Sequence, residues 1–251
     1  MTYSPREEEG TIAPTPSPEG PVAVIMAGGR GQRLRPLTDK VPKPLLRVGG
    51  RSIVERIILS LAEAGIRDVY LAVSYKAQAF EERLGDGAAL GVRITYLRER
   101  ERLGTAGALS MVPPDLGRSL LVMNADIMTR LVFADLVSFH GEHGDPATIA
   151  AIRYTSRVPY AVLRTEGTAL TGIEEKPEQG VLCNAGIYML RPEVLPLVPA
   201  DTTIDMPDLL EKVMAEGRPV RVFEIRDKWF DIGSPEDFEH VLLEFATGEE
   251  E

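Results

Sequence analysis

The chain is poor in the residues that mark several common classes of protein. Its single cysteine, Cys183, excludes an internal disulfide and fits the reducing cytoplasm. Three scattered histidines give no zinc-binding pattern. No apolar run approaches the roughly 18 residues of a membrane span, and the N-terminus lacks the charged start and apolar core of a secretory signal. We therefore expect a cytoplasmic protein with no membrane association.

Acidic residues outnumber basic ones. The formal net charge is −10, which argues against non-specific binding to nucleic acid, because that needs a basic face. With 251 residues, of which 44% are hydrophobic, one large α/β domain with a substantial core is the natural prediction. Residues 1–20 are rich in Pro, Glu, Ser and Thr, and predict a flexible tail or a linker remnant of a longer protein. The folded domain is then expected over residues 21–247.

Glycines and cations gather in one segment near the N-terminus. Residues 22–26 form a short apolar run typical of a buried parallel strand. Three glycines follow, where backbone can approach a ligand without interference from a Cβ: Gly28, Gly29 and Gly31. Five basic residues lie within reach of the same loop: Arg30, Arg33, Arg35, Lys40 and Lys43. Backbone N–H groups surrounded by cations predict a phosphate-binding loop.

Two familiar phosphate loops do not match this segment. The dinucleotide fingerprint requires a third glycine where Leu34 stands, and the Walker loop requires a Gly-Lys-Ser/Thr string that is absent. Three prolines, Pro36, Pro42 and Pro44, disfavour a helix directly after the turn. We interpret the segment as a long, proline-stiffened loop over a triphosphate; a solvated basic loop is the alternative.

Strand-like and helix-like segments alternate through the first half of the chain. Strands are expected at residues 22–26, 69–73, 92–97, 120–124 and 148–153, and helices at 52–64, 77–84 and 131–143. The second half is less regular, with strands at 161–164, 170–175, 185–190 and 220–225, and helices at 206–216 and from 235 onwards. This order predicts βαβ units and a mostly parallel sheet, with ligands beyond the carboxyl ends of its strands.

A carboxylate stands at the end of one predicted strand. Asp126 follows the apolar run 120–124, where its charge costs desolvation free energy unless a cation is close. Magnesium bound to a triphosphate would be such a cation. A helix-capping aspartate before Leu131 is the alternative.

The N-terminal segment resembles the signature of sugar-1-phosphate nucleotidylyltransferases, the NDP-sugar pyrophosphorylases. The likeness rests on residues 28–34 together with residues 42–45, and departs at Gln32, where the family often has Thr or Ser. It implies a Rossmann-like, mostly parallel mixed sheet flanked by helices, the nucleotide-diphospho-sugar transferase fold. The C-terminal β-helix of many relatives is not expected here. The resemblance implies that the nucleotide is bound by Ala27, Gly28, Gly29, Arg30, Gly31, Gln32, Gly104 and Thr105.

The same resemblance assigns the reacting groups. Asp126 and Asp231 would hold Mg²⁺; Asp231 lies in a segment, 229–235, similar to the Trp-x-Asp-x-Gly-Thr-Pro segment of the family. Ala125 replaces the glycine that usually precedes the first aspartate. Arg33 would stabilise the leaving pyrophosphate, and Lys43 and Lys176 would hold the α-phosphate and the attacking phosphate.

The sugar would be bound by groups from the second half of the chain. Glu175 and Lys176 resemble the Glu-Lys-Pro motif of the family, although without the resemblance they would be taken for a surface turn. Asn184 would bond a sugar hydroxyl, Gly186 would leave room for the ring, and Gly104 would lie against nucleoside and sugar.

The segment 103–109 bears on the choice of nucleotide. Its Gly-Thr-Ala-Gly resembles the guanylyltransferase version found in GDP-mannose pyrophosphorylases, whereas a plain strand-to-helix turn would need glycine as well. The expected reaction joins an NTP, with GTP favoured, to a sugar 1-phosphate, with mannose 1-phosphate or a related hexose or heptose 1-phosphate favoured, and releases pyrophosphate (EC 2.7.7 type). Uridylyl or thymidylyl transfer, a glycosyltransferase, a non-catalytic NDP-sugar sensor and a homodimer stay open.

Overall fold

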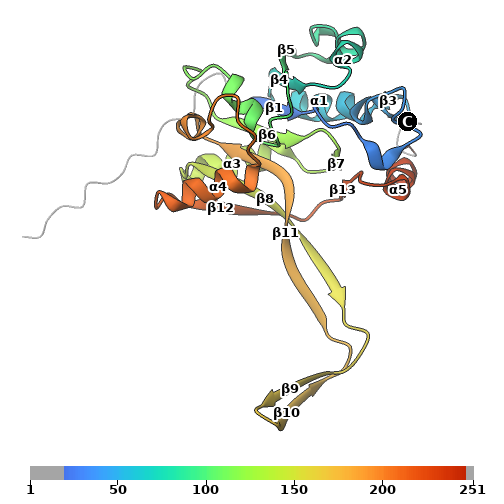
Figure 1. Ribbon diagram of the computed structural model, residues 1–251, viewed down its shortest axis with the longest axis vertical. Helices are drawn as coiled ribbons and strands as arrows, with labels where there is room; N and C mark the ends of the chain where they lie inside the picture. The colour runs from blue at the N-terminus through green and yellow to red at the C-terminus, as the bar shows by residue number, and fades with distance from the viewer. Residues whose placement is uncertain (1–19, 247–251) are drawn as a thin grey trace, which may run out of the picture.

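The centre of the fold is a seven-stranded sheet. The computed structural model describes residues 20–246, without the side chain of Ala246, and the strand order is β12-β8-β11-β6-β1-β4-β5 (Figure 1). β11 alone runs antiparallel to its neighbours β6 and β8, and the other pairs are parallel. The predicted mostly parallel sheet is therefore confirmed. Its strands are β1 (Val22–Met26), β4 (Asp68–Val73), β5 (Arg93–Arg98), β6 (Leu120–Asn124), β8 (Ala147–Arg157), β11 (Glu178–Leu190) and β12 (Val220–Ile225).

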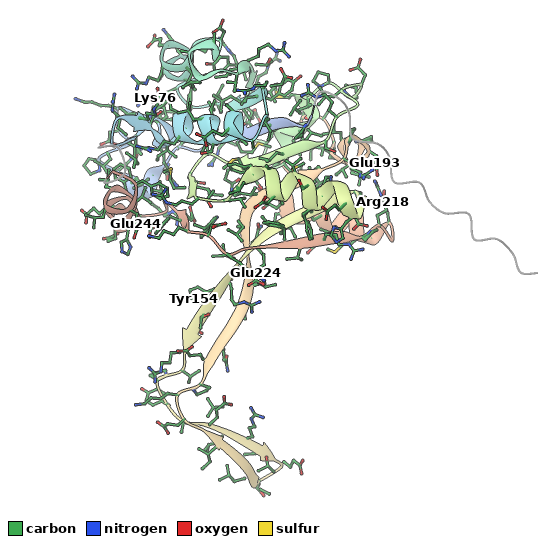
Figure 2. All side chains as sticks on the ribbon, turned by 180° about the vertical axis from the view of Figure 1, so that it is seen from behind. Lys76, Tyr154, Glu193, Arg218, Glu224 and Glu244 are labelled. Carbon is green, nitrogen blue, oxygen red and sulfur yellow. The ribbon has the colours of Figure 1, made fainter. Side chains whose placement is uncertain are left out.

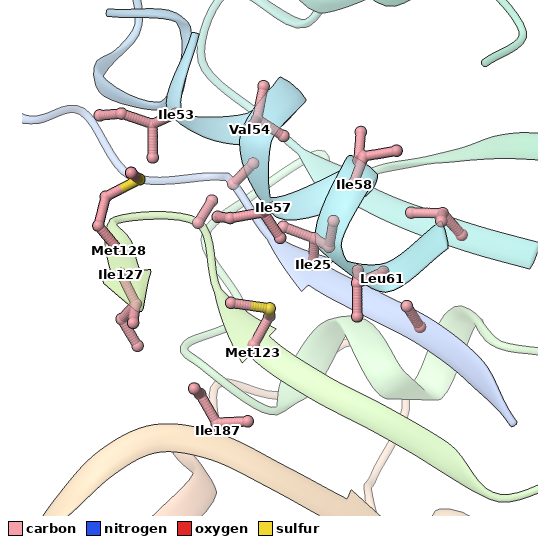
Figure 3. Packing of buried hydrophobic residues seen from close by; sticks show 14 of the residues in the cluster. Ile25, Ile53, Val54, Ile57, Ile58, Leu61, Met123, Ile127, Met128 and Ile187 are labelled. Atoms are coloured by element: carbon pink, nitrogen blue, oxygen red, sulfur yellow. The ribbon is translucent and has the colours of Figure 1, made fainter. Parts of the chain in front are cut away.

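Helices cover both faces of the sheet, because the central strands are apolar on both sides. Ile25 and Met123 pack with Ile58 in one buried cluster (Figure 3), whereas Val24 and Val122 pack with Leu209 in the other. The first helix begins as predicted, with Glu55 and Ser52 forming a capping box. The helices are α1 (Ile53–Glu63), α2 (Ala77–Leu84), α3 (Phe133–His143), α4 (Met206–Ala215) and α5 (Pro235–Ala246). None of these described helices is long and apolar enough to span a membrane.

Two short strand pairs were not predicted from the sequence. β2 (Arg47–Val48) pairs with β3 (Arg51–Ser52), and β7 (Ile127–Thr129) pairs with β13 (Trp229–Asp231). Strands of two or three residues are too short to show a hydrophobic period. The β7–β13 pair matters for function because it brings residues 126 and 231 together.

An arm, defined here as residues 153–183, projects from the sheet (Figure 1). Its stalk is made by the outer parts of β8 and β11, and its tip is the hairpin β9 (Val162–Glu166) and β10 (Ala169–Glu174). The predicted hairpin strands are confirmed. The predicted strands 148–153 and 185–190 cover only the parts of β8 and β11 within the sheet, because the outer parts lack a buried face.

One buried histidine makes the core sensitive to acid. His140 is 3% exposed, its Nδ1 lies 2.9 Å from Thr148 Oγ1, and its Nε2 has no hydrogen-bond partner among the described residues. Burial and the nearby charge of Arg191 lower the pKa of His140 to about 4. Between pH 6.5 and pH 4, this residue is therefore protonated in the unfolded chain but not in the folded chain.

We predict that the folded protein loses stability as the pH falls through this window. The loss attributable to His140 reaches about 3 kcal/mol near pH 4, from the shift between 6.5 and about 4. In urea unfolding at several pH values, the free energy of unfolding of the His140→Gln variant should fall less with decreasing pH than that of the wild type. The matched control is His143→Gln, an exposed histidine on the same helix, and an equal change there would contradict the assignment.

Candidate active site

The loop after β1 folds back on itself at the carboxyl ends of the strands. Gly31 has a φ of +60°, and its carbonyl accepts a 2.7 Å hydrogen bond from Thr38 Oγ1. Leu34 is 1% exposed and anchors the loop in the core. A Cβ on Gly31 would lie 3.1 Å from the Cβ of Lys43, so that the two ends of the loop are in contact. The chain thus gathers cations from both ends of the segment at one place, as the sequence predicted.

Lys43 forms the principal ion pair of the site. Its Nζ lies 2.7 Å from Asp126 Oδ2, and Lys43 is only 8% exposed. Asp126 follows β6, and the N–H of the preceding Ala125 donates to the carbonyl of Met26 at the end of β1. The ion pair therefore connects the N-terminal loop to the middle of the sheet.

The β7–β13 pair brings the second carboxylate to the first. Asp231 is the register partner of Ile127, and the N–H of Ile232 donates to the carbonyl of Asp126 at 3.0 Å. The pKa of the Asp231 carboxyl is raised, first because neighbouring atoms displace water from it and second because Asp126 carries a like charge. The charges of Lys43 and Arg33 act in the opposite direction. The two carboxylates are thus close enough to interact.

Arg33 belongs to the same group of charges. A Cβ on Gly233 would lie 3.5 Å from Arg33 Nη1, so the guanidinium rests on the turn that follows β13. That turn is held by Asp237, whose Oδ2 accepts N–H bonds from Gly233 at 3.1 Å and Ser234 at 2.8 Å. Beside it is a cavity of about 320 Å³. The cavity is lined by backbone and cations of the N-terminal loop and by Arg102: Ala27, Gly29, Arg30, Gly31, Gln32, Arg33, Lys43, Arg102 and Asp126 are among its residues.

A second cavity, of about 250 Å³, adjoins the first and shares Gly29, Arg102 and Asp126 with it. Gly28 lies on one side of it and the loop of Gly104 on another. The carboxyl of Glu99 also lines this cavity, against Gly28, where a Cβ would overlap Glu99 Oε2. Partial burial raises the pKa of Glu99, although the N–H of Leu103 donates to its carboxyl.

The Gly104 loop is locked to the start of α4. Thr105 donates its N–H to Asp205 Oδ1 at 2.8 Å, and Thr105 Oγ1 accepts a 2.9 Å bond from the N–H of Met206. A Cβ on Gly104, whose φ is +80°, would lie 2.5 Å from the carbonyl oxygen of Ile204. Only glycine fits this approach, which explains the first glycine of the Gly-Thr-Ala-Gly string.

Two of the predicted sugar-binding residues lie beside these cavities. Gly186 has a φ of +68°, and a Cβ there would lie 2.9 Å from the Nδ2 of Asn124, which lines the second cavity. The side chain of Asn184 donates to Tyr188 Oη at 2.7 Å and accepts from the N–H of Gly186 at 2.9 Å. Asn184 therefore fixes the turn of β11 beside the site.

The structure does not bring Glu175 and Lys176 to the other predicted site residues. Both lie on the arm, after β10 and beyond the outer end of the stalk (Figure 1). Lys176 has a φ of +46°, which is unusual for a residue with a side chain. The physical reason for the separation is the uninterrupted pairing of β8 and β11 outside the sheet.

Several lining residues were missed in the sequence analysis. Glu99 and Arg102 stand among other charges in the run 98–102, where nothing in the pattern distinguishes them. Asn124 ends a predicted strand and Asp205 precedes the predicted helix 206–216, and both line the second cavity. The position of Asp205 beside Thr105 depends on residues 100 positions apart in the chain.

Comparison with known proteins identifies the family. The model of the nucleotidyl transferase family matches residues 22–247. The chain belongs to this family. The predicted family is thereby confirmed.

Individual relatives support this family membership. A mannose-1-phosphate guanylyltransferase catalytic subunit beta of Drosophila pseudoobscura pseudoobscura is 36% identical over 226 residues, covering 87% of this chain and 61% of that protein. A mannose-1-phosphate guanyltransferase of Saccharomyces cerevisiae is 36% identical over 228 residues, covering 86% of this chain and 62% of that protein. The chain thus spans less than two thirds of the length of these relatives. The crystal structure of HddC from Yersinia pseudotuberculosis has the same fold, with a TM-score of 0.69, 24% identity and coverage of 89% of this chain and 98% of that one.

The paired carboxylates of this nucleotidyl transferase suit a divalent cation that also binds phosphate. Within residues 20–246, no group of three or more His, Cys, Asp or Glu side chains is placed to hold a metal. Asp126 and Asp231 supply only two carboxylates, and Mg²⁺ commonly combines one or two carboxylates with water and substrate phosphates. Partial burial and the like charge of Asp126 raise the pKa of Asp231, and a bound cation would oppose both effects. These residues therefore fit Mg²⁺ delivered with a nucleotide.

We predict that Asp231→Asn stabilises the protein in the absence of divalent metal at neutral pH. The substitution removes a charge that its surroundings disfavour, since a raised carboxyl pKa means that ionisation costs more in the folded than in the unfolded state. A thermal scan in EDTA should show an increase in Tm on the order of 2 °C. Adding MgCl₂ and GTP should stabilise the variant less than the wild type. Asp115→Asn, at an exposed position, is the control, and a lower Tm for Asp231→Asn in EDTA would contradict the prediction.

Proposed function

We propose that this chain transfers a nucleotidyl group from an NTP to a sugar 1-phosphate, forming an NDP-sugar and pyrophosphate. The single observation that carries the proposal is the adjacency of two cavities around Asp126. One is lined by Arg30, Arg33, Lys43 and backbone N–H groups, and the other by Glu99 and the Gly104 loop. The first has the chemistry of a triphosphate site and the second that of a nucleoside site.

The reaction needs little from the protein besides position and charge. A non-bridging oxygen of the sugar 1-phosphate attacks the α-phosphorus in line, one P–O bond forms, and the bond to the β-phosphate oxygen breaks to release pyrophosphate. The attacking phosphate is already ionised at neutral pH, so no general base is required. Lys43 neutralises charge at the α-phosphate and Arg33 at the leaving pyrophosphate, and both effects are largest in the transition state.

The metal would complete this neutralisation. Asp126 and Asp231 would hold Mg²⁺, which would supply positive charge to the phosphate oxygens when bound. Lys43 donates to Asp126 in the structure, and it is positioned to hold that carboxylate in place. In this proposal the two carboxylates bind the metal, and neither is needed for proton transfer.

Glu99 supports guanine as the base. The Watson–Crick edge of guanine offers two neighbouring donors, N1–H and the 2-amino group, which a carboxylate accepts together. Uracil and thymine offer one donor between two acceptors, so a carboxylate would oppose their carbonyl oxygens. The relatives named mannose-1-phosphate guanylyltransferase point in the same direction. We therefore infer GTP and mannose 1-phosphate as the preferred pair.

The proposed function is tested by pyrophosphate release with Mg²⁺ over a grid of NTPs and sugar 1-phosphates. The wild type should turn over best with GTP and mannose 1-phosphate. Asp126→Asn should lower kcat/KM by on the order of 100-fold or more, since both metal binding and the Lys43 ion pair are lost. Asp115→Asn should behave as the wild type. Nucleotide binding without pyrophosphate release across the grid would instead identify a sensor of NDP-sugars.

We predict that Glu99→Gln relaxes the choice of base. An amide offers one acceptor and one donor, which matches the N3–H and the O4 of uracil but opposes one donor of guanine. The ratio of kcat/KM for GTP to that for UTP should fall by about 10-fold to 100-fold. Steady-state kinetics with both nucleotides provides the test, with Glu101→Gln, an exposed neighbour in the same run of charges, as control. An unchanged ratio would remove Glu99 from base recognition.

A further inference from the structure

The arm exposes an apolar face that the rest of the described chain leaves uncovered. In the hairpin β9–β10, Leu163 is the register partner of Ile173, and Leu170 is the partner of Thr165, so all four side chains are on one face. Leu163, Leu170 and Ile173 are 59%, 54% and 63% exposed. The opposite face is polar and carries the ion pair of Arg164 with Glu174 at 3.0 Å. A two-stranded hairpin of this kind has little stability of its own, and its apolar face calls for a partner surface.

Apolar side chains are also exposed along the stalk, between the hairpin and the core domain. Tyr154 and Val181 are register partners on one face of the stalk, and are 57% and 55% exposed. Figure 2 shows Tyr154 on the arm, beyond Glu224 on the outer strand of the sheet. Half of the large apolar side chains that the described residues expose lie on the arm: Tyr154, Tyr160, Leu163, Leu170, Ile173, Val181 and Leu182.

The arm is directed away from the site of its own chain. β8 and β11 are paired without interruption from Ala151 and Asn184 to Arg157 and Glu178, a distance of about 20 Å for six residues at roughly 3.3 Å each. The register shift lies at the inner end, between Asn184 and Tyr188. Folding the tip back onto its own core domain would require this ladder to break.

The bend between the hairpin and the stalk carries a cation and a carboxylate that have no partner among the described residues. Lys176 and Glu175 are exposed, and neither makes a hydrogen bond or an ion pair with any described residue. The φ of +46° fixes Lys176 at the bend between hairpin and stalk. An ammonium and a carboxylate on neighbouring residues are suited to a phosphate and to sugar hydroxyls, respectively.

Beyond the cavity that we assign to the triphosphate, the core site has little positive charge. The second cavity is lined by three carboxylates, Glu99, Asp126 and Asp205, and by one cation, Arg102. A sugar 1-phosphate would bring a further negative charge next to them. A cation from outside the core domain would complete the site.

We propose that the arm of one copy crosses to a second copy of the chain, and that its Lys176 and Glu175 complete the sugar-phosphate site of that copy. This inference rests on the proposed function. In a two-fold dimer both arms exchange reciprocally, so that each apolar hairpin face is buried on the core domain of the other copy and both sites are completed at once. A second copy is favoured over the chain's own core domain because the stalk is regular, and over an unrelated protein because the incomplete site and the unpaired Lys176 belong to the same molecule.

Complementation between two inactive variants tests this arrangement. Lys176→Ala lacks the arm cation, and Asp126→Asn lacks the core carboxylate; each homodimer should lose most of its mannose 1-phosphate-dependent pyrophosphate release. In a heterodimer, the intact core of the first variant receives the intact arm of the second. Co-expression with two different tags and tandem purification should therefore recover about half of the wild-type activity per dimer, because one of two sites is complete. Arg33→Ala in place of Asp126→Asn guards against a folding defect, and no recovery with either pair would overturn the proposal.

The apolar face provides an independent test. The double variant Leu163→Lys/Ile173→Lys should run as a monomer in size-exclusion chromatography with light scattering, whereas the wild type should have twice the mass of one chain. The variant should still bind GTP but should show at least a 10-fold higher KM for mannose 1-phosphate. Glu166→Lys, on the polar face, is the matched control and should stay dimeric. A monomeric wild type would overturn the proposal; a wild type without turnover would defeat the proposed function, and the masses alone would then decide the arm exchange.

Discussion

The ion pair between Lys43 and Asp126 is the contact on which the rest of the site depends. Lys43 pairs with a carboxylate 83 positions further along the chain, so this contact is made by folding alone. It draws the N-terminal loop over the carboxyl ends of β1 and β6, where parallel strands leave a crevice. The β7–β13 pair places Asp231 beside this ion pair.

The local parts of this arrangement could be predicted from the sequence. The strand 22–26, the glycines behind it and the capping box of Ser52 and Glu55 depend on residues close together in the chain, and the structure contains all three. Asp126 could be singled out because a carboxylate at the end of an apolar strand requires a cation, and Lys43 is that cation in the structure.

The parts that escaped prediction depend on contacts between distant residues. Thr105 and Asp205 are both ordinary turn residues in sequence, and only the fold makes Asp205 an acceptor for the N–H of Thr105. Glu99 was hidden in a run of alternating charges, and its burial against Gly28 arises from the pairing of β4 with β5. The extent of the arm could not be read from hydrophobic period, because neither face of the stalk is covered within the described chain.

The register shift between Asn184 and Tyr188 divides β11 into two parts that are under different structural constraints. The inner part, up to Leu190, is buried between β6 and β8 and cannot change length without shifting the core. The outer part pairs only with β8, so paired residues can be added or removed there in register while the strand ends around Asp126 stay in place. The length of the arm can therefore change in evolution, by adding or removing paired residues of the stalk, without altering the residues around Asp126.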